Sequence, residues 1–172
     1  MTRFMSLSLI CVLLAVALHF LTIAAMPRVL MAVASARLQE QGMVFNAMVH
    51  PGPRTSEEQT IVRPSPDLLY SVCLYDVTAG PVRITTGAIP DTYWSISGFA
   101  ANTDNFFVIN DIMADGAPVE VKIGRFGSNE ATVDYQSPSA RGMILLRMLM
   151  TDSEALPALE EARRATRCEA VR

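Results

Sequence analysis

An unbroken apolar block near the start of the chain constrains the fold more than any other feature. Residues 7–25 carry no formal charge, and only Ser8, His19 and Thr22 among these 19 residues are not apolar. At about 1.5 Å of rise per residue, a helix over this block is roughly 28 Å long, close to the hydrocarbon thickness of a bilayer. The sequence therefore predicts a transmembrane helix within residues 1–26, broken or ended at Pro27, and the lipid bilayer as a partner.

A cleaved secretory signal is the main alternative to an uncleaved anchor. Such signals have an apolar stretch of about 7 to 15 residues followed by a small-x-small cleavage site. Here the block is longer, and the better cleavage match, at residues 32–34, lies well past its end. A signal anchor is therefore favoured over cleavage, and over a buried globular helix. The basic start, with Arg3, resembles that of an export signal and predicts that the rest of the chain lies outside the cytoplasm.

The charge balance excludes one class of partner. After the apolar block the chain carries 13 basic and 17 acidic residues, so this part has a formal charge of 13 − 17 = −4. A nucleic-acid-binding surface needs a concentrated basic face, so no nucleic acid is predicted as a partner. With 51% hydrophobic and 18% charged residues, the 172-residue chain has the composition of a folded protein rather than a disordered one.

Two segments separate the apolar block from the part with strand-like periodicity. Residues 29–41 are rich in helix formers, and Gly42 is suited to end a helix there. Residues 51–66 hold four of the ten prolines, which predicts an extended linker because proline fixes φ and lacks a donor. We divide the chain into an anchor (1–26), a helical stalk with a Pro-rich linker (27–59) and a folded domain (60–172).

The folded domain shows the period of two that is typical of strands. Alternation predicts seven strands, near residues 70–75, 82–86, 93–99, 106–109, 119–123, 131–135 and 143–150. Short turns with Gly, Pro or Asp separate them, so the fold class is predicted as mainly β, an antiparallel β-sandwich or barrel-like domain. A short C-terminal helix is expected over residues 153–167, with Ser153 as its cap.

The three cysteines of the chain help to indicate whether it lies in an oxidising compartment. Cys11 lies in the apolar block, which leaves Cys73 and Cys168 as a pair in the remaining chain. In an oxidising compartment these two can form a disulfide that closes a loop of about 95 residues. The alternative is two unpaired thiols, one buried in a strand and one in a frayed tail.

Sequence motifs of known enzyme classes are missing. His50 is the one imidazole after the apolar block, too few for a multi-histidine metal site, and neither a glycine-rich phosphate loop nor a Gly-x-Ser-x-Gly elbow occurs. No metal and no cofactor is predicted. A Cys73–His50 pair for thiol catalysis is a weaker hypothesis than a buried cysteine.

Polar residues at strand ends are the candidate ligand-binding positions. They are Asp67, Tyr70 and Ser71 at the first strand, and Asn102, Asp104 and Asn105 between two apolar strands. Their oxygens can bind a hard cation or hydrogen-bond a small ligand. Asp, Asn and Ser also bond the backbone of their own turns, which is the structural alternative.

Five segments together resemble a known family. They are Arg63–Ser71 (RPSPDLLYS), Tyr75–Val77, Gly80–Val82, Tyr93–Ile96 and Asn102–Phe107. In this order they resemble the motifs of the bacterial domain-of-unknown-function family 1254. The resemblance runs from about residue 60 to the C-terminus and is closest to short members anchored in bacterial envelopes by a single helix.

The resemblance implies a β-rich domain with an export topology, and it implies no established activity. Ser65 and Leu68 stand where the family motif has asparagine and threonine. Members of this short type tend to be accompanied by proteins of a sister family, number 1214. A membrane-anchored protein of that sister family is therefore an expected partner.

Two functional hypotheses remain open at this point. The favoured one is a non-enzymatic, single-pass protein of the bacterial inner membrane whose C-terminal domain lies in the periplasm and binds a protein partner or a small ligand. The alternative is a hydrolase-like or ligand-processing enzyme with a polar cleft around Asp67, Tyr70 and Asp104. Catalysis requires these groups to lie within hydrogen-bonding reach of one another, which a structure can decide.

Overall fold

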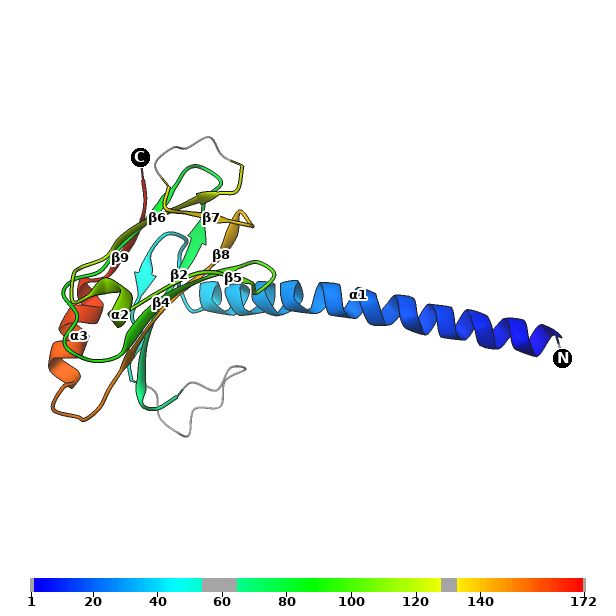
Figure 1. Ribbon diagram of the computed structural model, residues 1–172, viewed down its shortest axis with the longest axis horizontal. Helices are drawn as coiled ribbons and strands as arrows, with labels where there is room; N and C mark the ends of the chain where they lie inside the picture. The colour runs from blue at the N-terminus through cyan, green and yellow to red at the C-terminus, as the bar shows by residue number, and fades with distance from the viewer. Residues whose placement is uncertain (1, 54–64, 128–132, 172) are drawn as a thin grey trace.

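A computed structural model describes residues 2–53, 65–127 and 133–171. A single long helix, α1 (Thr2–Glu40), projects from a domain built of two β-sheets (Figure 1). Large apolar side chains stand exposed along α1 from Phe4 to Leu30. Within the described residues α1 is the one helix long and apolar enough to cross a membrane, by length and composition.

The helix does not break or end at Pro27, contrary to the sequence-based expectation. Proline removes one backbone donor from the ladder, but α1 continues for 13 residues beyond it, to Glu40. In the same turn the Arg28 guanidinium donates to the Ala24 carbonyl at 2.9 Å. The anchor and the stalk are therefore one continuous helix.

Within the described residues, nine strands form two sheets. The first sheet, here sheet A, has the order β1 (Met48–Val49), β2 (Leu68–Asp76), β8 (Arg141–Leu149), β4 (Trp94–Ala100) and β5 (Asn105–Asn110). The second, sheet B, has the order β7 (Tyr135–Ser137), β6 (Glu120–Arg125), β3 (Val82–Thr85) and β9 (Arg167–Ala170). Two short helices, α2 (Asp111–Ala114) and α3 (Leu156–Ala165), complete the domain.

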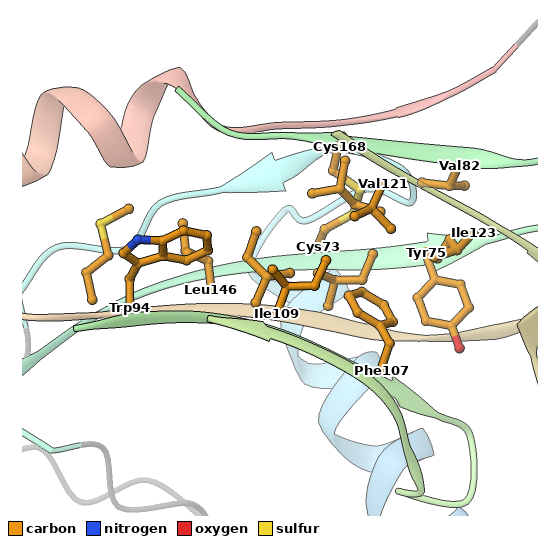
Figure 2. Close-up of a cluster of buried hydrophobic side chains, with 14 of the residues drawn as sticks. Cys73, Tyr75, Val82, Trp94, Phe107, Ile109, Val121, Ile123, Leu146 and Cys168 are labelled. Atoms are coloured by element: carbon orange, nitrogen blue, oxygen red, sulfur yellow. A yellow bond between two sulfur atoms is a disulfide. The ribbon is translucent and has the colours of Figure 1, made fainter. Parts of the chain in front are cut away.

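The core lies between the two sheets, as strand alternation requires. Trp94, Phe107 and Leu146 point inward from sheet A, and Val82 and Val121 point inward from sheet B (Figure 2). The mainly β prediction is confirmed, and six of the seven predicted strands have a counterpart. The predicted strand at 131–135 begins outside the described residues, and it overlaps β7 at Tyr135 alone. The sheets are not wholly antiparallel, because β6 and β7 pair in parallel.

A disulfide links the sheets across this core. Cys73 on β2 and Cys168 on β9 are bonded, with their Cα atoms 6.4 Å apart, and both residues are buried (Figure 2). The predicted pairing is confirmed. Cys168 lies in a strand paired with β3 rather than in a frayed tail.

The β-domain begins before the predicted boundary at residue 60. Met43 is buried against Val72 and Leu74 on the side of sheet A that faces away from the core. The Asn46 side chain accepts a hydrogen bond from the Asp76 backbone N–H and donates one to the Asp76 carbonyl. Residues 43–50 therefore belong to the β-domain, and Leu38 at the end of α1 packs against the same apolar cluster.

The C-terminal helix starts later than predicted. α3 begins at Leu156, and Asp152 rather than Ser153 supplies the carboxylate that accepts from the Ala155 backbone N–H, at 2.7 Å. Pro157 lies in the first turn, where its missing donor has no intrahelical partner to lose. The helix ends at Ala165, and the chain continues directly into β9.

Candidate functional site

The predicted polar residues between β4 and β5 bond to one another. The Asn102 amide donates to the Asp104 carboxylate at 2.5 Å, and the Asp104 backbone N–H donates back to the Asn102 side chain at 3.3 Å. Thr103, between them, has φ of 68° in the left-handed region. These contacts match the structural alternative, in which such side chains stabilise their own turn. Asn105 begins β5 opposite Phe99.

The predicted residues at the start of β2 lie in three different environments. Asp67 is exposed, and its backbone carbonyl accepts from Met150. The Tyr70 hydroxyl accepts from the Ser65 backbone N–H at 2.9 Å. Ser71 is fully buried. Tyr70 and Ser71 point to opposite faces of sheet A, because neighbouring strand residues do.

The two predicted groups lie at opposite ends of sheet A. At one end Leu68, next to Asp67, pairs with Leu149, and at the other end Ala100, before the Asn102 turn, pairs with Gly142. Seven residues of β8 separate these rows, roughly 23 Å at 3.3 Å per residue. Asp67 and Asp104 therefore share no cavity, and the enzymatic alternative lacks the convergence that it requires. A separate ligand-binding role for either group stays a prediction.

Ser71 belongs to a buried polar cluster that joins the start of sheet A to α3. Its hydroxyl lies 2.8 Å from His50 Nδ1. Next to this pair, Arg163 is 1% exposed and donates to the carbonyls of Pro51 and Tyr70, at 2.5 and 2.7 Å. Its other terminal nitrogen binds both carboxylate oxygens of Glu160, at 2.5 and 2.6 Å.

The electrostatics of this cluster disfavour protonation of its imidazole. Burial lowers the pKa of His50 below its usual value, and the nearby charges of Arg163 and Arg167 lower that pKa further. Ser71 is fully buried on the core side of sheet A, the side of Leu69 and Cys73, so its hydroxyl cannot reach a substrate in this structure. The Cys73–His50 thiol hypothesis is wrong, since Cys73 is in the disulfide. The cluster holds β1, β2 and α3 together.

A second polar group lies on the outer side of sheet A, and of its residues the sequence analysis predicted only Tyr70. The register aligns four polar residues of neighbouring strands in one row across the sheet: Tyr70, Arg147, Ser95 and Asn110. In the next row, Leu145 and Val108 flank Ser97. Because Trp94 and Ile96 point into the core, Ser95 and Ser97 point away from it.

We call this surface the β4 face. It consists of the outward side chains of β4 and its two neighbours: Tyr93, Ser95, Ser97, Val108, Asn110, Leu145 and Arg147. Tyr93 and Val108 are 47% and 42% exposed, whereas Ser95 and Ser97 are at most 1% exposed. A serine is shorter than Leu, Val or Arg, so the two hydroxyls form a floor between larger neighbours.

Three buried polar atoms of the β4 face have no hydrogen-bond partner within residues 2–53, 65–127 and 133–171. They are Ser95 Oγ, Ser97 Oγ and Arg147 Nε. Buried polar groups in native proteins are nearly always paired, so such a concentration in one place points to a missing partner. The sequence carried a partial signal, because Ser95 and Ser97 alternate with apolar residues in a buried strand.

Other features of the described residues do not form a competing site. One open hollow lies at the start of α1, lined by Arg3, Ser6, Leu7 and Ile10, and another lies beside α3, lined by Pro157, Glu160, Glu161, Arg164 and Ala165. Neither includes a predicted site residue. Within the described part of the chain, no three His, Cys, Asp or Glu side chains are grouped to hold a metal ion.

The order of the strands and the motifs on them can now be compared with known proteins. The model of a family described as "Protein of unknown function (DUF1254)" matches residues 45–170. The chain belongs to the DUF1254 family. The match starts at Phe45, in agreement with the early start of the β-domain in the structure. No curated protein matches the chain.

Two solved structures share the fold. The VPA0106 protein from Vibrio parahaemolyticus is 12% identical with a TM-score of 0.68, over 87% of this chain and 36% of that one. An uncharacterized protein from Burkholderia cenocepacia is 15% identical with a TM-score of 0.52, over 91% of this chain and 42% of that one. The chain therefore spans less than half the length of both of these structures.

Proposed function

We propose that this DUF1254 protein is a single-pass protein of the bacterial inner membrane that holds its β-domain in the periplasm and binds a protein partner there. The exposed apolar length of α1 supports the membrane anchor. The Cys73–Cys168 disulfide supports an oxidising compartment, because cytosolic proteins are kept reduced. The basic residue at the start of the chain, Arg3, is consistent with export.

The observation that carries partner binding is the β4 face. Its buried polar atoms lack partners in the described residues, and apolar side chains stand exposed beside them. The face is a strand surface, whereas small-molecule sites are typically concave. A protein surface is therefore a better fit to it than a small ligand.

The family resemblance indicates which kind of protein this partner is. Members of the short, anchored type that this chain resembles tend to be accompanied by proteins of the sister family 1214. We propose a membrane-anchored protein of family 1214 as the partner.

Co-purification tests the proposed function. The full chain, tagged at its C-terminus, is expressed together with the family 1214 protein of the same organism and extracted from membranes in a mild detergent. We expect the two proteins to elute together at a fixed ratio in size-exclusion chromatography. Elution of each protein on its own at micromolar concentration would contradict the proposal.

A further inference from the structure

We infer that the β4 face is the docking surface for this partner, and that the partner places a carboxylate on Arg147 between flanking apolar side chains. The inference rests on the proposed function and adds to it the surface and the chemistry of recognition. Four observations support it: an arginine without a carboxylate, a floor of unpaired hydroxyls, an apolar rim, and the direction in which α1 leaves the domain.

The arginine is the electrostatic centre of the β4 face. Arg83 pairs with Glu169 and Arg141 with Asp76, at 2.5 and 2.7 Å, and Arg167 donates to the backbone carbonyls of Arg164 and Thr166. Within the described ranges Arg147 has no such ion pair, and its Nε is buried without a partner. A guanidinium presents a planar fork of donors that fits a carboxylate with two parallel hydrogen bonds. An acidic side chain or a C-terminal carboxylate meets this need.

The serine floor adds hydrogen-bonding capacity beside the arginine. Ser95 lies directly opposite Arg147 in the register, and Ser97 lies two residues further along β4. Each hydroxyl can donate one hydrogen bond and accept others. Leaving them buried and unpaired costs the isolated protein stability. The larger side chains around the floor cover both hydroxyls, so a partner that displaces these side chains and brings polar atoms to the floor removes that cost.

The rim of the β4 face is apolar. Val108 and Tyr93 lie on the face itself, and α2 follows β5 directly with Ile112 and Met113 at 81% and 63% exposed. Exposed apolar side chains around polar anchors are typical of protein interfaces. The partner segment is therefore expected to carry apolar residues next to its acidic group.

The position of α1 brings this face within reach of a second membrane protein. Leu38 and Met43 pack on the outer side of sheet A, and Figure 1 shows α1 leaving the domain from that side. The part of α1 from Arg28 to Glu40 spans about 20 Å at 1.5 Å per residue. With the apolar block in the bilayer, the outer side of sheet A therefore faces the membrane across a gap of this size.

Retention of the family 1214 protein by matched variants tests the inference. Arg147→Gln removes the charge on the β4 face, and Arg83→Gln is the control, since it removes an arginine from an ion pair on sheet B. A charged hydrogen bond contributes enough to binding that its loss lowers affinity by about tenfold or more. We expect Arg147→Gln to lose the partner at concentrations where wild type and Arg83→Gln retain it.

A second variant separates binding from folding. Ser97→Ala deletes a buried hydroxyl that has no partner in the described residues. We expect it to raise the thermal midpoint of the full chain without partner by a few degrees and to weaken retention of the partner. A variant that merely damaged the fold would lower both the thermal midpoint and the retention of the partner.

Photocrosslinking identifies the surface directly. A photoreactive residue at position 108 is expected to react with the family 1214 protein close to an Asp, a Glu or the C-terminus, whereas one at position 126, which is exposed beyond β6, is expected not to react with it.

Retention of the partner by both Arg147→Gln and Ser97→Ala overturns the inference while the proposed function stands. Crosslinks from position 108 to a second copy or within this chain alone also overturn it. If the wild-type chain does not retain the family 1214 protein, both the inference and the proposed function are overturned.

Discussion

Single residues in this domain are fixed by contacts that lie far away in the sequence. Arg163 is the clearest case, because it contacts carbonyls of Pro51 and Tyr70 that lie 112 and 93 residues earlier. Burying a guanidinium is expensive unless its hydrogen bonds are made. The contacts of Arg163 therefore make it a structural residue that joins α3 to the start of sheet A.

The two adjacent arginines of α3 allow a matched test. Arg163→Met leaves Glu160 and two strand-end carbonyls without their donor, and we expect it to lower the free energy of unfolding by about 3 kcal/mol. Arg164→Met removes an arginine whose side chain is 73% exposed and that also contacts Glu160, so a change within about 0.5 kcal/mol is expected. Urea unfolding in detergent, followed by the fluorescence of the buried Trp94, measures both. An equal loss of unfolding free energy in the two variants would refute the assigned role of Arg163.

The residue scale is also where the sequence was least informative. Ser71 and Tyr70 were singled out as neighbours, yet the pleat places them on opposite faces, in the Arg163 cluster and in the Arg147 row. Arg147 is a candidate because the register of three strands places it opposite Ser95. Register is a long-range property, and a single sequence does not display it.

At the scale of elements, the disulfide is the main covalent constraint on the sandwich. It bonds β2 of sheet A to β9 of sheet B, and β9 pairs with β3 alone in sheet B. Closing a loop of 95 residues restricts the unfolded chain strongly. The bond therefore keeps a four-residue edge strand in place.

Removing both cysteines tests this constraint. The double substitution Cys73→Ser, Cys168→Ser is expected to lower the free energy of unfolding by about 4 kcal/mol, as the chain-entropy model gives for a loop of this length. Equilibrium urea unfolding of the full chain in detergent measures the change. Cys11→Ser is the control and is expected to leave stability unchanged, because Cys11 lies exposed on α1. A double variant as stable as wild type would contradict this role.

Elements with a clear period were predictable, and the others were not. Strands β2 to β6 and β8 show alternation over four to nine residues, so their positions followed from the sequence. Strand β1 has two residues, too few to alternate, and β9 follows directly on the predicted C-terminal helix, in four residues for which no strand was predicted. The parallel pairing of β6 with β7 depends on the arrangement of sheet B, which the local pattern does not contain.

At the scale of the whole molecule, one long helix and one face of a sheet carry the functional proposal. α1 presents apolar side chains to its surroundings over most of its length, and the β4 face presents unpaired polar atoms on the side from which α1 leaves. Both features concern surfaces that the described chain leaves without a partner. The proposed lipid around α1 and the proposed protein on the β4 face would cover both surfaces.

Cysteine labelling in spheroplasts tests the central claim most directly. In a Cys11→Ser background, Phe126→Cys places a thiol at an exposed position of the β-domain, while Cys73 and Cys168 stay paired. We predict that a membrane-impermeant maleimide labels position 126 in intact spheroplasts, on a full-length chain that remains in the membrane after alkaline carbonate extraction. Labelling only after lysis, or on a shorter polypeptide free of the membrane, would contradict the account.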